Sequence, residues 1–429
     1  SFMFTFSLLA QEKKYVFVEI NPFVDTNWNS VQKRHLFKNW YAVREDLAEK
    51  AINKEFGSLA PRRYLRNSKR SPRFLPKARY VQTAFDVKKT FSIFNDPSAD
   101  RFYPILDSVN NGISMEKSYV KFPHQGTDSL IIVAVVDTGV DYNHPDLKNV
   151  IWTNEDEIPA NGIDDDKNGY VDDIHGINTL VRDASGKPTS DPIDGHYHGT
   201  HVAGIIAAQH NNKIGLAGVS SHAIIMPIRT VPADADETDL DVVDAYIYAA
   251  KNGAKVINCS FGKSVSEGGT IVKEAIDFIY KNYGTVVVAA AGNDSFGPMN
   301  WFDIDVDKKY PASWNNPSLL TIASSTKSGS LSSFSNVGAK TVEFAAPGSD
   351  IFSTLPNGKY GNLSGTSMAT PVASGVVAEI MSRYPNLSGV QIRDILVNTV
   401  SPRKAFNDKM NGAGIVDLFS ALEHISNTH

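Results

Sequence analysis

Five continuous apolar runs, separated by helical patterns, constrain the fold more than any other feature of this 429-residue sequence. The runs cover residues 131–136, 223–228, 254–259, 285–291 and 319–323. Strands that are covered by helices on both faces of a parallel sheet give such runs. Helical patterns at about 240–252 and 270–283 end at glycines, as helices commonly do. The sequence therefore predicts an α/β fold with a doubly wound, mostly parallel sheet flanked by helices.

The charge of the chain is unevenly divided between its two parts. Residues 12–120 hold 20 Lys and Arg against 12 Asp and Glu, whereas residues 121–429 hold 22 against 35. A basic leader and an acidic body attract each other, so the charges favour two parts that bind each other over a nucleic-acid-binding protein. No stretch approaches the ~18 apolar residues of a membrane-spanning helix. The lone cysteine, Cys259, excludes an intrachain disulfide, and its apolar surroundings predict a buried thiol.

The first residues indicate export. Residues 2–10 are uncharged and apolar, and Ala10 precedes a polar, charged segment. Residues 1–11 therefore resemble the end of a signal peptide with cleavage after Ala10. A buried first strand is the alternative. With export, the protein would be secreted or periplasmic.

The remaining chain is expected to contain two domains. Residues 12–112 would form a small α+β domain, with a strand at 15–20 and a helix at 40–56. Residues 95–115 combine Asn, Asp, Pro and Gly, and this composition predicts a linker. Residues 113–429 would form the large α/β domain, whose functional residues are expected at the carboxyl ends of its strands.

Three short segments carry the residue types that nucleophilic acyl transfer requires. Asp137 leaves the first apolar run in Val-Val-Asp-Thr-Gly, and His198 opens a small-residue helix in His-Gly-Thr-His-Val-Ala-Gly. Ser367 enters another such helix in Gly-Thr-Ser-Met-Ala-Thr-Pro. In this chemistry the imidazole takes the serine proton, and the carboxylate holds the imidazole tautomer. A serine at a helix start also has backbone N–H groups close to the developing oxyanion.

These segments, in the order Asp, His, Ser, resemble the subtilisin-like serine proteases over about residues 113–423. The resemblance implies that Asp137 is the triad acid, His198 the general base and Ser367 the nucleophile. Asn293, in Ala-Ala-Ala-Gly-Asn, would supply the side-chain amide of the oxyanion hole. The implied substrate-binding residues are Ser260, Phe261, Gly262, Ala291 and Gly292.

The resemblance implies a secreted, monomeric endopeptidase that acts on polypeptides and is made as a zymogen. Residues 12–112 would then be its own inhibitory propeptide. Two alternatives remain open. One is a selective processing protease, whose preference Lys263 leaves undecided because many family members have glycine there. The other is a catalytically silent, calcium-stabilised binding module, since a fold alone does not fix function.

A zinc site offers another interpretation of the second segment. His196, His198 and His201 are close in sequence, but no acidic residue stands at the helical spacing of a metalloprotease. We therefore expect His201 to be a packed or hydrogen-bonded neighbour of the base, and no cofactor for catalysis.

An acidic loop at residues 161–173 predicts a structural calcium site. The candidate ligands are Asp164, Asp166, Asn168, Asp172 and the backbone carbonyl of Tyr170. They are spaced like the ligands of an EF-hand loop, although His175 stands where the bidentate Glu would be. These oxygen donors would repel one another without a cation, but an ordinary solvated loop is the alternative. A second calcium site, with Asp146 and Asn212, follows only from the resemblance.

Overall fold

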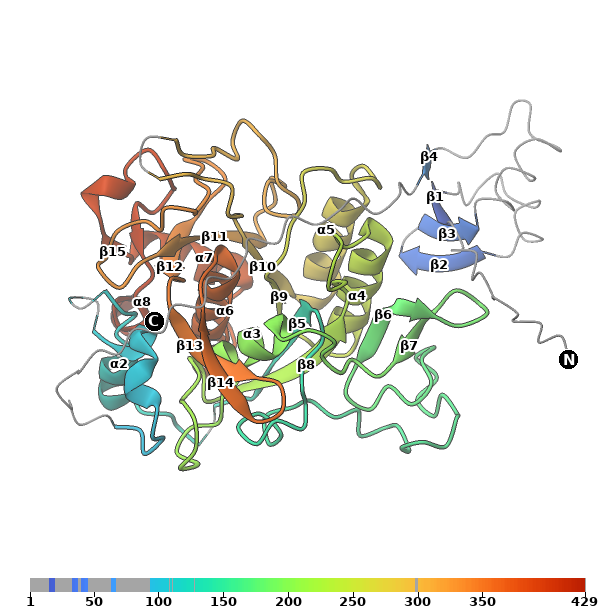
Figure 1. Cartoon of the computed structure of the whole chain (residues 1–429), viewed down its shortest axis with the longest axis horizontal. Helices are drawn as coiled ribbons and strands as arrows, with labels where there is room; N and C mark the ends of the chain where they lie inside the picture. The colour runs from blue at the N-terminus through green and yellow to red at the C-terminus, as the bar shows by residue number, and fades with distance from the viewer. Residues whose placement is uncertain are drawn as a thin grey trace, which may run out of the picture. The chain divides into compact units, whose positions relative to one another are not determined.

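A computed structural model describes residues 15–19, 33–37, 40–44, 63–66, 93–107, 109, 111–126, 128–297 and 300–428 (Figure 1). The chain divides into two compact units. The first consists chiefly of residues 1–69, and the second of residues 70–266 and 270–429. Among the described residues, no helix is both long and apolar enough to cross a membrane.

The small unit contains an antiparallel sheet in the order β2-β3-β1-β4. Its strands are β1 (Tyr15–Glu19), β2 (Lys33–Phe37), β3 (Trp40–Arg44) and β4 (Arg63–Arg66). The strand expected at 15–20 is confirmed. The helix expected from residue 40 is wrong at its start, because residues 40–44 pair with β1 as a strand. Aromatic and β-branched residues there, Trp40, Tyr41 and Val43, favour a strand over a helix. The rest of that helix and residues 1–11 lie outside the described residues.

The large unit is built on a sheet that has ten strands in the described part of the chain. The sheet order is β15-β16-β12-β11-β10-β9-β5-β8-β6-β7. The strands are β5 (Ile131–Asp137), β6 (Ile177–Arg182), β7 (Pro188–Ser190), β8 (Ala223–Arg229), β9 (Val256–Cys259), β10 (Val286–Ala290), β11 (Leu319–Ser325), β12 (Phe344–Pro347), β15 (Ser401–Pro402) and β16 (Gly414–Ile415). Pairing is parallel from β6 through β16, and only β7 and β15 add antiparallel edges among these strands. The five apolar runs are β5, β8, β9, β10 and β11, so the predicted α/β fold is confirmed.

Helices cover both faces of this sheet (Figure 1). They are α2 (Met115–Lys121), α3 (His198–Ala207), α4 (Asp239–Lys251), α5 (Ile271–Tyr283), α6 (Thr366–Arg383), α7 (Gly389–Asn398) and α8 (Leu418–Thr428). Alternate residues of β5, such as Val133 and Val135, join the core formed with α3 and α6. The residues between them, Ala134 and Val136, are buried outside that core, and α4 and α5 pack together. A hairpin of β13 (Ile351–Leu355) and β14 (Lys359–Leu363) packs on α3.

The segment expected to be a linker is instead part of the large unit. Residues 99–101 and 103–105 form 3₁₀ helices, and the side chains of Phe102, Ile105 and Ile113 are completely or almost completely buried in the core. The turn-forming residues were therefore misleading, because they alternate with large apolar side chains that anchor the segment. As a result, the domain boundary expected at residue 112 falls inside a packed region.

An ion-pair cluster anchors the C-terminal half of α6. Glu379 is fully buried and accepts hydrogen bonds from Nε of Arg383 (2.9 Å) and Oγ of Ser220 (2.9 Å). Nε2 of His124 lies 2.6 Å from the same carboxylate, and Nδ1 of His124 is hydrogen-bonded to Asp128. Burial alone would raise the pKa of Glu379, but the bond from His124 and the charge of Arg383 lower this pKa to about 2.

Replacing this carboxylate by an amide should destabilise the fold. Breaking one partner of a buried ion pair costs about 3–5 kcal/mol, so Glu379→Gln should melt well below the parent at pH 7. Because the folded pKa lies below the ordinary 4.5, the stabilisation is present above about pH 4.5 and is lost as the pH falls toward 2. Thermal melts in a Ser367→Ala background, which prevents autolysis, should show the two proteins converging as the pH falls from about 4.5 to about 2. A difference in melting temperature that stays constant over that range would contradict the ion-pair interpretation.

Candidate active site

Asp137 and His198 meet where β5 ends and α3 begins. Asp137 is the last residue of β5, His198 is the first residue of α3, and Oδ1 of Asp137 lies 2.7 Å from Nδ1 of His198. A Cβ at Gly199 would stand 2.0 Å from the carbonyl oxygen of Gly139, so glycine allows the helix to approach the strand. Since a carboxylate only accepts, Nδ1 carries the proton and Nε2 is left as the basic nitrogen.

A second carboxylate, which sequence reasoning missed, fixes the start of α3. Asp194 accepts hydrogen bonds from the hydroxyl of Thr138 (2.9 Å), the backbone N–H of His196 (2.8 Å) and the hydroxyl of Thr200 (2.5 Å). These contacts join the turn after β5 to the first turn of α3, where a helix favours negative charge. The sequence feature that could have pointed to Asp194 is its position, four residues before His198.

Ser367 is the second residue of α6 and is held against the end of β9. Its hydroxyl donates to the carbonyl of Ser260 (2.9 Å), and the hydroxyl of Ser260 donates to the carbonyl of Ser367 (2.9 Å). Nδ2 of Asn258 then donates to the hydroxyl of Ser260 (2.9 Å), and Ser374 donates to Oδ1 of Asn258 (2.9 Å). Because α3 and α6 pack against each other, His198 and Ser367 begin neighbouring helices on the carboxyl side of the sheet.

Asn293 follows β10 and faces the start of α6. Its Oδ1 accepts from the backbone N–H of Thr366 (2.8 Å) and from the hydroxyl of Thr366 (3.0 Å). These two donors fix the orientation of the amide and leave its NH₂ group to donate elsewhere. Nδ2 lies 3.7 Å from the point that a Cβ of Gly365 would occupy, beside the backbone N of Ser367. An NH₂ group and a helical N–H are therefore close to the nucleophile.

The residues expected to bind substrate occupy two neighbouring strand ends. Ser260, Phe261 and Gly262 follow β9, whereas Ala291 and Gly292 follow β10, which pairs with β9 in parallel.

Lys263 follows this stretch and presents no unpaired charge. Its Nζ lies 2.8 Å from Oδ1 of Asp239 and donates to the carbonyl of Glu237 (2.8 Å). Its charge is therefore balanced within the protein, and Lys263 gives no ground for a preference for acidic or basic substrates.

His201 fits the expectation of a hydrogen-bonded neighbour of the base. Its Nε2 donates to the carbonyl of Gly361 (3.1 Å), and the ring is completely buried. Burial lowers the pKa of His201 to about 3, so the ring is neutral at ordinary pH. Within the described residues, His196, His198 and His201 form no metal-ligating group of three.

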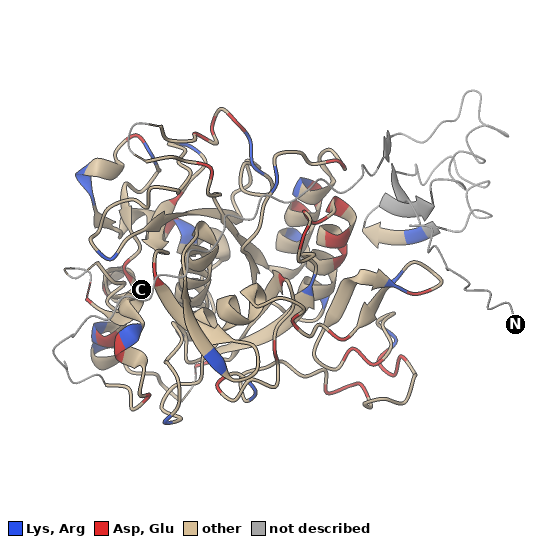
Figure 2. Ribbon diagram, viewed as in Figure 1, with Lys and Arg blue, Asp and Glu red and all other residues tan. Residues whose placement is uncertain are grey.

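The acidic loop brings three carboxylates together, and one of them, Glu157, is not among the predicted calcium ligands. Carboxylate oxygens of Glu157, Asp164 and Asp166 lie within 4.8 Å of one another. Asp172 instead accepts from the backbone N–H groups of Asn161 and Gly162. Figure 2 shows how acidic residues gather along this loop between β5 and β6. Glu157 was missed because it lies outside the alternating pattern of residues 164–172.

One atom in this loop supports a cation. Oδ1 of Asp164 is buried and has no hydrogen-bond partner in the described part of the chain. Asn168 lies beside these carboxylates, because its Nδ2 donates to Oδ2 of Asp166 (2.8 Å). Its Oδ1 accepts from the N–H of Tyr170 (2.8 Å). A buried carboxylate oxygen without a donor, beside two further carboxylates, fits the oxygen chemistry of Ca²⁺.

The second proposed calcium site gains a carboxylate from the segment first taken as a linker. Nδ2 of Asn212 donates to Oδ1 of Asp146 (2.7 Å), so the structure brings the two predicted residues together. Oδ1 and Oδ2 of Asp96 accept from the backbone N–H groups of Asn212 (2.9 Å) and Asn211 (2.8 Å) on the same loop. Burial raises the pKa of Asp146 to about 6, and the charge of Asp96 adds to this rise. Two buried carboxylates therefore bond to one loop, and carboxylate oxygens are the donors that Ca²⁺ prefers.

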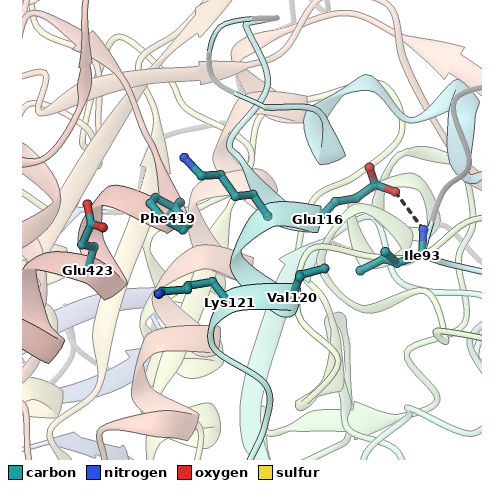
Figure 3. A pocket seen from close by; sticks show the side chains of 7 residues that line it. Ile93, Glu116, Val120, Lys121, Phe419 and Glu423 are labelled. Carbon is teal, nitrogen blue, oxygen red and sulfur yellow. Dashed lines mark hydrogen bonds between the residues drawn. The ribbon is translucent and has the colours of Figure 1, made fainter.

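A surface hollow between α2 and α8 lies apart from these sites (Figure 3). Its lining residues are Ile93, Glu116, Lys117, Val120, Lys121, Phe419 and Glu423. None of the predicted site residues is among them.

An acid ending β5, an imidazole opening α3 and a serine opening α6, in that chain order, define a subtilisin-like serine protease unit. The chain belongs to the subtilase family, because the model described as "Subtilase family" matches residues 128–416. This establishes the family that the motifs resembled.

Several named proteins are similar to this chain. Subtilisin-like protease 1 of Plasmodium berghei is 34% identical over 311 residues, which cover 68% of this chain and 49% of that protein. Thermitase of Thermoactinomyces vulgaris is 37% identical over 282 residues, 66% of this chain and 82% of its own. The chain thus spans about half the length of the Plasmodium relatives. Among solved structures, fervidolysin of Fervidobacterium pennivorans, described as a keratinolytic enzyme related to subtilisin, matches with TM-score 0.69 and 25% identity over 96% of this chain and 61% of its own.

Proposed function

We propose that this protein is a serine endopeptidase that hydrolyses polypeptides through an acyl-enzyme. The hydrogen bond between Asp137 and His198 carries the proposal, because it leaves a basic Nε2 on a helix that neighbours the helix of Ser367. Family membership and the named protease relatives support the same activity.

The residues would act in a defined order. The hydroxyl of Ser367 exchanges its bond to the carbonyl of Ser260 for one to Nε2 of His198 and attacks the peptide carbonyl carbon. His198 takes the proton, and Asp137 stabilises the resulting imidazolium. The NH₂ group of Asn293 and the backbone N–H of Ser367 stabilise the oxyanion. His198 then protonates the leaving amine, and water releases the acyl group by the reverse sequence.

Labelling with a fluorophosphonate probe tests this proposal. The parent protein should be labelled and Ser367→Ala should not. Ser364, an exposed serine three residues upstream, supplies the control, since Ser364→Ala should be labelled like the parent. A parent protein that is not labelled even after the small unit has been removed would favour the silent, calcium-stabilised binding module.

We also propose that Ca²⁺ stabilises the folded protein at two places. One is the loop with Glu157, Asp164, Asp166 and Asn168, and the other contains Asp146 with Asn212 and Asp96. The buried, partnerless oxygen of Asp164 supports the first. Two buried carboxylates, Asp96 and Asp146, that each bond to Asn212 support the second. Tyr170 and Asp172 belong to the same loop, and the carboxylate of Asp172 accepts hydrogen bonds from two backbone N–H groups.

Chelation should therefore lower the melting temperature. A cation bound only by the folded state adds about 2.7 kcal/mol at a hundredfold excess over its Kd. EDTA should destabilise the Ser367→Ala protein, and Asp166→Asn should remove part of that response. Asp165→Asn is the matched control, because Asp165 instead accepts from Ile158 and Asn161 outside the carboxylate trio. Identical melting curves with and without EDTA would remove both calcium sites.

The small unit would act as an inhibitory propeptide of an exported zymogen. Its separation as a compact unit and the excess of Lys and Arg in residues 12–120 support this role. Because residues 93–107 are packed into the large unit, we expect maturation upstream of residue 93. N-terminal sequencing of the active protein tests this, with Ser367→Ala as the uncleaved control. A mature N-terminus beyond residue 107 would contradict it.

A further inference from the structure

One buried asparagine side chain forms hydrogen bonds to the loop that carries Asn293. Asn336 is completely buried between β11 and β12. Its Nδ2 donates to the carbonyl of Ala291 (3.0 Å) and to Oδ2 of Asp294 (2.8 Å). Its Oδ1 accepts from the N–H of Asp294 (2.8 Å), and its own N–H donates to the carbonyl of Gly292 (3.0 Å).

The pattern of these bonds is selective. Both amide hydrogens, the amide oxygen and the backbone N–H of Asn336 are all directed to residues 291, 292 and 294. These residues flank Asn293 on both sides, yet Asn336 does not bond to Asn293 itself. The approach is close, because a Cβ at Gly292, whose φ is +104°, would come within 2.4 Å of Nδ2 of Asn336. Asn336 thus fixes the backbone from which the oxyanion amide projects.

Thr366 holds the same loop from the opposite side. Its hydroxyl accepts from the N–H of Gly292 (3.2 Å) and donates to Oδ1 of Asn293 (3.0 Å). Thr366 precedes Ser367 on α6, so its contacts move with the nucleophile. Asn336 instead lies in the connection between β11 and β12, apart from α6. Hydrogen bonds from two residues on different elements, Asn336 and Thr366, therefore set the position of the Asn293 amide relative to Ser367.

We propose that Asn336 is a positioning residue for the oxyanion hole, acting on the transition state through Asn293. This inference rests on the proposed endopeptidase function. Stabilisation of an oxyanion depends on donors held 2.7–3.1 Å from the developing charge. A displacement of about 1 Å can cost on the order of 10² in rate. A residue that only secures this loop can therefore control kcat without touching the substrate.

Asn336→Asp gives the sharpest test. The side chain keeps its shape and its acceptor for the N–H of Asp294, but it loses both donors and places a carboxylate oxygen against Ala291 and Asp294. We expect kcat for a peptide substrate to fall about 10- to 100-fold with KM changed less than about threefold. The inhibition constant of a peptide boronic acid, whose tetrahedral adduct places an oxygen in the hole, should rise by a similar factor. A kcat within twofold of the parent would overturn the proposal.

A double-mutant cycle separates positioning from general damage. In an Asn293→Ala background the positioned amide is absent, so Asn336→Asp should lower kcat by less than about threefold further. The same fold-loss in both backgrounds would show that Asn336 acts independently of Asn293 and would overturn the proposal. Asn336→Ala is measured in the same cycle with the same expectation, and it decides the matter if the aspartate variant does not fold.

Asn316 supplies a matched control at the opposite end of β11. Its Nδ2 donates to Oδ1 of Asp277 (2.9 Å), and its Oδ1 accepts from the N–H of Ser318 (2.9 Å), so its chemistry parallels that of Asn336. Asn316→Asp should lower the melting temperature comparably and change kcat less than twofold. An equal kcat loss in the control would overturn a specific role for Asn336. An inactive parent protein would instead mark failure of the endopeptidase proposal itself.

Discussion

Ser367→Ala should lower kcat for a peptide substrate by on the order of 10⁶-fold, the size of loss found when the catalytic serine or histidine is removed from a subtilisin. Without the hydroxyl, no acyl-enzyme can form, and His198 has no nucleophile proton to accept. The remaining acceleration, about 10³–10⁴ over water, would come from the oxyanion hole and substrate binding alone.

The fold should tolerate this change. The only described hydrogen bond that the Ser367 hydroxyl makes is the one to the carbonyl of Ser260. The backbone carbonyl of Ser367 keeps its bond from the hydroxyl of Ser260. Melting temperature should therefore stay within a few degrees of the inhibited parent, measured beside single-turnover kinetics. A variant that retains more than about 1% of the parent kcat would contradict the assignment of Ser367 as nucleophile.

The sheet could be predicted from the sequence because its central strands are buried on both faces. Val133 and Val135 face one helical layer while Ala134 and Val136 are buried outside it, so the run is apolar throughout and its length marks a strand. The end of such a run also places Asp137 at the carboxyl edge of the sheet, where a parallel fold collects its functional residues. The apolar pattern of the sequence and the topology of the sheet therefore both place Asp137 at this edge.

Contacts between distant segments were beyond the reach of the same reasoning. Asp96 and Asn212 are 116 positions apart, and nothing local in Asn-Asp-Pro distinguishes a ligand-like carboxylate from a turn. Asn336 lies 43 positions from Asn293, inside a Ser-rich stretch whose composition is that of an ordinary loop. The identity of such residues becomes visible only when tertiary packing brings their polar atoms to the site.

Asn293→Ala should slow turnover about 10²–10³-fold, equivalent to about 2.7–4 kcal/mol of transition-state stabilisation, as found for the corresponding amide of a subtilisin. KM should change little, because this donor binds the oxyanion of the transition state more strongly than the neutral carbonyl of the substrate. Steady-state kinetics with a chromogenic peptide, on samples whose active sites have been titrated, would measure both quantities. An unchanged kcat would remove Asn293 from the oxyanion hole.

Asn293→Asp separates the two jobs that this side chain performs. A carboxylate restores an acceptor for the N–H and hydroxyl of Thr366, which the alanine variant lacks, but it offers no donor and places negative charge where the oxyanion develops. If Asn293 acts as a donor, the aspartate variant should be at least as slow as the alanine variant although its melting temperature recovers. If kcat recovers with the melting temperature, the amide serves only to hold Thr366 at the start of α6. The donor role then passes to the backbone N–H of Ser367 alone.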